Sequence, residues 1–155
     1  CDRLTAEGAT AHLVEVGGEL RGQGIKPDGR PWWAELQGPP GFTGPRTLAA
    51  LFDQAVATSG DYIKGFDAYG RRYGHTLDGR TGEPVNNGVV SATVLADTAF
   101  RADGLATAFT VMGHEEALEF AEAFNVACAI VRRDEEAGLI ETTSLAWDAM
   151  ADDAA

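Results

Sequence analysis

Short runs of alternating or β-branched apolar residues occupy the first hundred positions of the chain, and turns rich in glycine, proline and aspartate separate them. This pattern is typical of antiparallel strands. The runs predict strands over residues 12–16, 31–37, 47–52, 55–58, 62–66, 71–77 and 89–96. Turn chemistry predicts that hairpins close at residues 26–30, at Asp53-Gln54 and at residues 67–70. Residues 38–45 hold three prolines and three glycines, so a surface loop is expected there.

The apolar spacing changes from the period of a strand to that of a helix after residue 97. It predicts one helix from Thr98 to Met112, ended by Gly113, and a second from Glu115 to Asn125. A short helical segment is also expected at residues 2–8.

A last pair of strands is predicted at residues 126–132 and 139–142, and the alanine-rich, acidic tail at residues 144–155 is expected to fray. Strands are thus followed by helices and then by strands again, without regular βαβ alternation. This order predicts an α+β fold, with a mainly antiparallel sheet of hairpins and helices packed on one face.

Composition and charge narrow the class of protein. The chain has 155 residues, 45% of them hydrophobic and 23% charged, which predicts a single domain over residues 1–155. With 24 acidic and 12 basic residues, the formal net charge is −12. This charge argues against nucleic acid or an anionic membrane as a direct partner, because phosphate backbones attract basic surfaces. An acidic protein that binds an anionic dinucleotide would need a cation between the two.

Residues 73–84 combine reactive side chains with three glycines, a composition that favours a shaped loop. The side chains are those of His75, Asp78, Arg80 and Thr81. His75 is a candidate general base, because an imidazole with an ordinary pKa of about 6.5 accepts a proton at neutral pH. The aspartate or the arginine could orient it or hold a phosphate. The alternative is a plain turn with a surface imidazole and a surface salt bridge.

Two further stretches carry candidate ligands. The first, Thr58-Ser59-Gly60-Asp61, offers backbone amides and hydroxyls that could cradle a phosphate or a ribose. In the second, Asp103 and Thr107 are four residues apart on a predicted helix, so they share one face and present the hard oxygen donors that Mg²⁺ takes. The alternative is an aspartate that favours the helix dipole and a threonine bonded to its own helix.

Three stretches in this order resemble the ApbE family of flavin transferases, the FAD:protein FMN transferases. The family patterns read approximately TSGDY, YSHIIDPRTGxP and ADALATALFVMG, where this chain has TSGDY (58–62), YGHTLDGRTGEP (73–84) and ADGLATAFTVMG (102–113). The resemblance begins before Leu13 and runs to about Val131. Of the departures at Gly74, Thr76, Gly79 and Gly104, only Gly74 loses a polar group, the serine hydroxyl of the family pattern.

The resemblance implies that this chain is the C-terminal portion of an ApbE-like domain, because the family's N-terminal half has no counterpart here. It implies Mg²⁺ ligands at Asp103 and Thr107, completed by a backbone carbonyl from the missing half, and a role for His75 in catalysis and flavin binding. Further contacts to FAD are expected from Thr58, Ser59, Gly60, Asp61, Asp78, Arg80 and Thr81.

The implied activity is magnesium-dependent transfer of FMN from FAD to a threonine or serine hydroxyl of an acceptor flavoprotein, with release of AMP. Two alternatives stay open at this point: hydrolysis of FAD to FMN and AMP, and a non-catalytic flavin-binding or interaction domain. The missing N-terminal half is a possible partner. The family is bacterial, with exported or lipid-anchored members and cytoplasmic ones.

Overall fold

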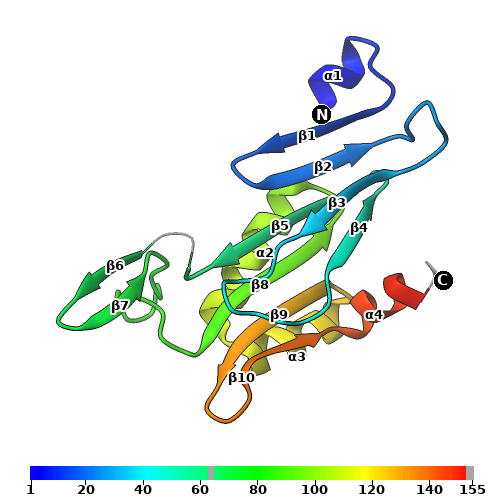
Figure 1. Ribbon diagram of the computed structural model, residues 1–155. Coiled ribbons are helices and arrows are strands. Elements are labelled where there is room, and N and C mark those ends of the chain that lie inside the picture. Colours follow the sequence, from blue (N-terminus) through cyan, green and yellow to red (C-terminus); the bar gives the residue numbers. More distant parts are fainter. Residues whose placement is uncertain (63–64, 153–155) are drawn as a thin grey trace.

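A six-stranded antiparallel sheet forms the centre of the computed structural model, which describes residues 1–62 and 65–152 (Figure 1). The strands lie in the order β1-β2-β5-β8-β9-β10, and neighbours pair antiparallel throughout. Their bounds are β1 His12–Val16, β2 Glu19–Gln23, β5 Ala55–Gly60, β8 Val89–Ala96, β9 Ala127–Asp134 and β10 Gly138–Thr143. The sheet confirms the predicted fold class.

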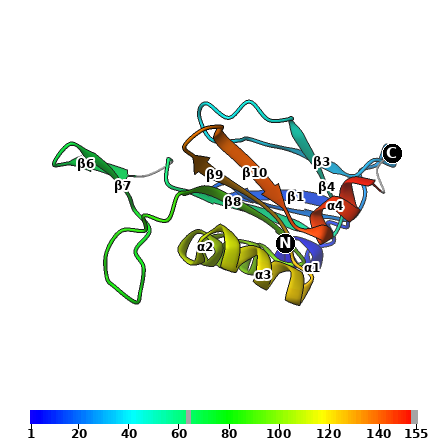
Figure 2. The ribbon, with the colours of Figure 1, turned by 90° about the horizontal axis from the view of Figure 1, so that it is seen from below.

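Helices α2 (Ala99–Met112) and α3 (His114–Phe124) cover one face of this sheet (Figure 2). Helix α2 begins where the Thr98 hydroxyl accepts a hydrogen bond from the Arg101 amide, and it ends at Gly113, whose φ of 91° is costly for other residues. The core between helices and sheet comprises Val89, Ala92, Val94, Ala106, Phe109, Ala117, Ala121, Val126, Cys128 and Ile130. Burial raises the pKa of the Cys128 thiol to about 11, as suits a small buried hydrophobic residue.

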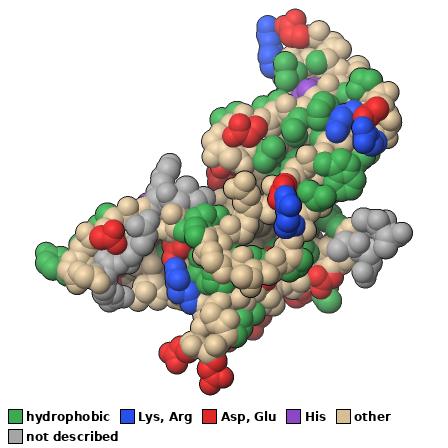
Figure 3. All heavy atoms as spheres, viewed as in Figure 1, with side chains coloured by type: hydrophobic (Ala, Val, Ile, Leu, Met, Phe, Trp, Pro, Cys, Tyr) green, Lys and Arg blue, Asp and Glu red, His purple; other side chains and the backbone are tan. Residues whose placement is uncertain are grey.

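A two-stranded hairpin of β3 (Trp32–Leu36) and β4 (Thr47–Leu51) packs on the opposite face. Its inner side chains include Leu51, which packs with Val56 of the central sheet. The layers approach closely, since a Cβ atom on Gly22 would overlap the Leu51 carbonyl oxygen. Hydrophobic side chains also lie on the outer surface of this hairpin, where Trp33 and Leu48 are exposed (Figure 3).

This second layer corrects two of the predicted hairpins. The strand at residues 31–37 does not pair with the strand before it, and the strands around Asp53-Gln54 do not pair with each other. Instead, the loop at residues 38–45 joins β3 to β4, and Asp53, with a φ of 53°, redirects the chain from one layer to the other. Alternation of apolar residues showed that these strands bury one face, but it carries no information on the pairing partner.

The third predicted hairpin forms and extends away from the central sheet (Figure 1). It consists of β6 (Gly65–Ala68) and β7 (Arg71–Gly74), joined by Tyr69 and Gly70, which both have positive φ. Its strands are shorter than predicted, and residues 63–64 of the predicted first strand lie outside the described part of the chain.

The remaining elements are α1 (Asp2–Ala6) and α4 (Leu145–Asp152). Strand β2 and helix α4 were not predicted, whereas the strands at 12–16 and 89–96, both main helices and the last hairpin are confirmed within a few residues. Residues 153–155 of the tail lie outside the described part. Among the described helices, none is long and apolar enough to cross a membrane.

Candidate functional site

Ser59 and Thr107 meet where strand β5 passes beneath helix α2. Their hydroxyl oxygens are 2.9 Å apart, and Thr107 lies on an exposed part of the helix. Asp103, also exposed, lies one turn earlier on the same helix. The structure therefore places a carboxylate and two hydroxyls, contributed by two of the three predicted stretches, on one flank of α2.

Thr58 lies on the other face of the sheet. Its hydroxyl is 2.9 Å from that of Thr93 on β8, the residue directly opposite it in the strand pairing. Successive side chains of a strand point to opposite faces, so Thr58 and Ser59 cannot line the same site. The structure does not bring Thr58 together with the other predicted residues.

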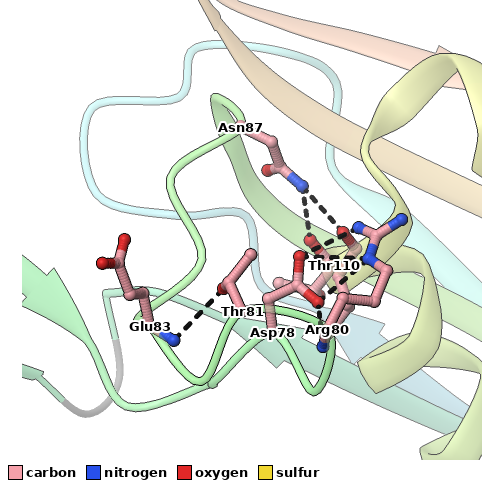
Figure 4. Close-up of polar contacts among 7 residues, drawn as sticks. Asp78, Arg80, Thr81, Glu83, Asn87 and Thr110 are labelled. Carbon is pink, nitrogen blue, oxygen red and sulfur yellow. Dashed lines mark hydrogen bonds and ion pairs between the residues drawn. The ribbon is translucent and has the colours of Figure 1, made fainter.

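The loop that follows β7 is held together by its own hydrogen bonds (Figure 4). Arg80 makes a forked contact with Asp78 at 3.0 Å and also donates its backbone amide to that carboxylate. Because Asp78 is hydrogen-bonded to this guanidinium, its pKa is lowered from the usual 3.8, and the pKa of Arg80 is raised. The Thr81 hydroxyl accepts a hydrogen bond from the Glu83 amide at 3.2 Å.

Backbone contacts close the loop at its base. Leu77 and Pro84 form an isolated β-bridge, and the Val85 amide donates to the Thr76 carbonyl oxygen at 3.0 Å. The charged pair and the loop backbone, together with Val111 and Met112 of helix α2, line a cleft of about 260 Å³. The loop is therefore a shaped unit, packed against the C-terminal end of that helix.

His75 is exposed at the start of this loop, directly after β7. Its neighbour Gly74 lies against Asp61, since a Cβ atom on Gly74 would be 3.4 Å from the Asp61 Cβ. Asp61 in turn accepts a contact of 3.4 Å from the Arg133 guanidinium, and the Asp61 amide donates to Val90. Asp61, at the end of the stretch Thr58-Ser59-Gly60-Asp61, thus lies next to the start of the loop. Gly60, which separates Asp61 from Ser59, is the last residue of β5.

One residue that holds this region together, Asn87, was not among those predicted from the sequence. The side-chain amide of Asn87 donates to the carbonyl oxygens of Thr110 and Val111, at 3.0 and 3.2 Å (Figure 4). It joins the end of the loop to helix α2. The acceptors are backbone atoms more than twenty residues away, which residue type and spacing do not reveal.

Comparison with known proteins identifies the class of domain. The family model described as the ApbE family matches residues 1–130. The chain belongs to the ApbE family. It is 39% identical over 138 residues to a Vibrio cholerae protein named FAD:protein FMN transferase, a match that covers 87% of this chain and 41% of the relative. A Haemophilus influenzae protein of the same name is 36% identical, with 92% and 42% covered.

Solved structures of ApbE proteins share this fold. The apo form of the Pseudomonas stutzeri flavinyl transferase ApbE superposes with a TM-score of 0.82 at 40% identity, covering 96% of this chain and 45% of that one. The Vibrio cholerae flavin transferase ApbE gives a TM-score of 0.81 at 36% identity, with 96% and 47% covered. The chain therefore spans less than half the length of the ApbE proteins that it matches.

The oxygen donors on helix α2 fit the chemistry of Mg²⁺. This ion binds through one or two carboxylates and completes its shell with waters and substrate phosphates. Asp103 and Thr107 supply such donors on an exposed flank. Within residues 1–62 and 65–152, no group of three or more His, Cys, Asp and Glu side chains could enclose a metal ion.

Proposed function

We propose that this chain is the C-terminal portion of an FAD:protein FMN transferase. The reaction transfers FMN from FAD to a threonine or serine hydroxyl of an acceptor flavoprotein and releases AMP. The observation that carries the proposal is the group formed by exposed Asp103 and Thr107 with half-buried Ser59, beside a packed loop that begins with His75, in a fold matched at a TM-score of 0.82 by a flavinyl transferase.

Asp103 and Thr107 are the residues that would hold Mg²⁺. When bound, this ion neutralises charge on the FAD diphosphate and favours phosphoryl transfer. A net charge of −12 supports such a cation, because the protein would otherwise repel an anionic dinucleotide. Ser59 holds the Thr107 hydroxyl at 2.9 Å and so orients one of the two oxygen donors.

His75 is the proposed base. It accepts the proton of the acceptor hydroxyl as that oxygen forms a bond to the FMN phosphorus, and the bond between this phosphorus and the bridging oxygen of the diphosphate breaks. AMP leaves with the bridging oxygen.

Arg80 presents a guanidinium, fixed by Asp78, near the C-terminal end of helix α2, whereas Asp103 lies in the first half of that helix. Val111, which lines the same cleft as Arg80, lies eight residues beyond Asp103, a span of about 12 Å along the helix at about 1.5 Å per residue. An extended dinucleotide suits such a span.

The rest of the pocket is proposed to come from the part of the family fold that this chain does not span. The share of the relatives that the chain covers supports this, since it is 41% of the Vibrio cholerae protein and 45% of the Pseudomonas stutzeri structure. Below, "the longer protein" means this chain joined to that remaining part.

The experiment compares Asp103→Asn with Glu119→Gln, a matched change at an exposed carboxylate of α3, in the longer protein. Asp103→Asn removes one charged donor and leaves the shape unchanged. We expect it to lower turnover at least about a hundredfold at ordinary magnesium, in the range found for electrostatic groups of active sites, with the melting temperature unchanged. Normal turnover and an unaltered magnesium dependence in Asp103→Asn would remove the metal assignment.

A further inference from the structure

Both the nitrogen and the oxygen of the Asn87 side-chain amide make hydrogen bonds. Its nitrogen donates to the carbonyl oxygens of Thr110 at 3.0 Å and of Val111 at 3.2 Å, and its oxygen accepts from the Val89 amide at 3.2 Å. The residue therefore joins the last turn of helix α2 to the first residue of strand β8 and to the end of the loop.

The two carbonyl groups belong to the helix end. The last four carbonyl groups of an α-helix have no partner within the helix. In α2, which ends at Met112, Thr110 and Val111 are among them. Gly113 follows with a φ of 91°, and a Cβ atom there would lie 3.5 Å from the Asn87 nitrogen. A side chain from a distant segment thus caps this helix.

The loop and the helix carry different parts of the proposed site. The loop segment 76–85 is closed by the Leu77–Pro84 bridge and by the hydrogen bond from Val85 to Thr76, so its two ends are held together. At one end it continues into His75 and Gly74, beside Asp61. At the other end Asn87 attaches it to α2. That attachment sets where the loop lies along the helix.

We propose that Asn87 is a positioning residue for the transfer reaction. It holds the loop that begins with His75 at a fixed place relative to Asp103 and Thr107 on helix α2. This inference rests on the proposed function, since it assigns a catalytic consequence to the placement of those residues. Asn87 itself touches none of the reacting groups.

The decisive variant is Asn87→Asp, which keeps the shape of the side chain. It retains an oxygen for the Val89 amide but turns a second oxygen toward two carbonyl oxygens that previously accepted hydrogen bonds. The contact becomes repulsive and the loop is displaced from the helix. Asn86→Asp is the matched control, because it makes the same change of charge at the exposed neighbouring residue, which makes none of these three contacts.

Turnover per folded molecule is measured in the longer protein over a range of magnesium concentrations. We expect Asn87→Asp to lower kcat by roughly ten- to a hundredfold, because a displacement of about 1 Å can cost that much. The magnesium concentration for half-maximal rate stays the same, since both proposed metal donors are on α2. Asn86→Asp leaves both quantities unchanged.

A merely structural cap gives a different result. Asn87→Asp would then lower the melting temperature but leave kcat per folded molecule at the wild-type value, and the proposal would be overturned. If Asn87→Asp does not fold, Asn87→Ala removes the donors without the repulsion and is judged by the same criteria.

Two reference variants separate this proposal from the proposed function. If Asp103→Asn and His75→Ala both keep the wild-type rate, the proposed function fails and the positioning role fails with it. If both lose activity while the Asn87 variants behave like Asn86→Asp, only the positioning role fails.

Discussion

Thr58 and Ser59 are adjacent in sequence and similar in chemistry, yet they face different layers of the molecule. Ser59 contacts Thr107 under helix α2, and Thr58 contacts Thr93 on the opposite face. Ser59→Ala should therefore raise the magnesium concentration for half-maximal rate at least several-fold, as loss of an orienting contact to a metal ligand does. Thr58→Val should leave it unchanged and cost about 1 kcal/mol of stability, the usual worth of one hydrogen bond. Equal effects on magnesium dependence would contradict this assignment.

His75 is tested by the pH dependence of turnover. If it accepts the acceptor proton, the rate should fall at acid pH, because a protonated ring has no lone pair to accept with. His75→Ala should lower the rate by roughly 10² to 10⁴, the usual contribution of a general base. His114→Ala, at the start of α3, is the control. Rates are measured per folded molecule from about pH 5 to 8; a flat profile with a near-normal mutant rate would make His75 structural.

Titration of the Asp78–Arg80 pair does not contribute to this pH dependence of the rate. The hydrogen bond from Arg80 lowers the pKa of Asp78 below its usual 3.8. A carboxylate with a depressed pKa in the folded state contributes stability above its unfolded-state pKa and loses it only as the pH falls through the folded-state value. That loss lies below pH 3.8, so the loop keeps its ion pair throughout the assay.

At this scale, the sequence identified candidate residue types for the site but not which face of the molecule each side chain lines. Asp103 and Thr107 share a helix flank as their spacing predicts, because helical periodicity is a local property. Whether Ser59 or Thr58 faces that flank depends on which layer covers which face of the sheet. Asn87 was missed because its acceptors are carbonyl groups at the end of a distant helix.

At the scale of elements, periodicity predicted the strands and helices better than their partners. Strand β8 and the helices α2 and α3 lie close to where residue patterns placed them, because each has a clear period and a clear cap. Strands β4 and β5 follow one another across a three-residue connection, yet they belong to separate sheets stacked face to face. Burial of Leu51 between the layers decides this arrangement, and it is a tertiary effect.

Two glycine substitutions test the stacking of the layers. Gly22→Ala should lower the free energy of unfolding by more than about 1 kcal/mol, because its Cβ would overlap the backbone of Leu51 and force the layers apart. Gly104→Ala, the same chemical change on an open part of α2 where a Cβ meets nothing within 4 Å, should raise it by about 0.5–1 kcal/mol. Urea unfolding measures both, and a stability for Gly22→Ala equal to the wild type would contradict the close approach.

At the scale of the whole molecule, we propose that the sheet, its helices and the exposed flank of α2 form one part of a larger active site. The chain covers 41% of the Vibrio cholerae relative and 45% of the Pseudomonas stutzeri structure. The proposed donors, the carboxylate of Asp103 and the hydroxyl of Thr107, lie open to solvent and leave the rest of the Mg²⁺ shell to waters, substrate phosphate and other groups. We therefore expect that transfer requires the longer protein.

The most direct test measures both products of the reaction together. The longer protein is incubated with FAD, magnesium and an acceptor flavoprotein that a relative such as the Vibrio cholerae transferase modifies, and AMP and protein-bound FMN are quantified. We predict equal amounts of the two, neither of them in the presence of excess chelator, and neither from this chain alone. AMP accompanied only by free FMN would show hydrolysis of FAD instead, and the absence of AMP from active, folded longer protein would contradict the proposed transferase.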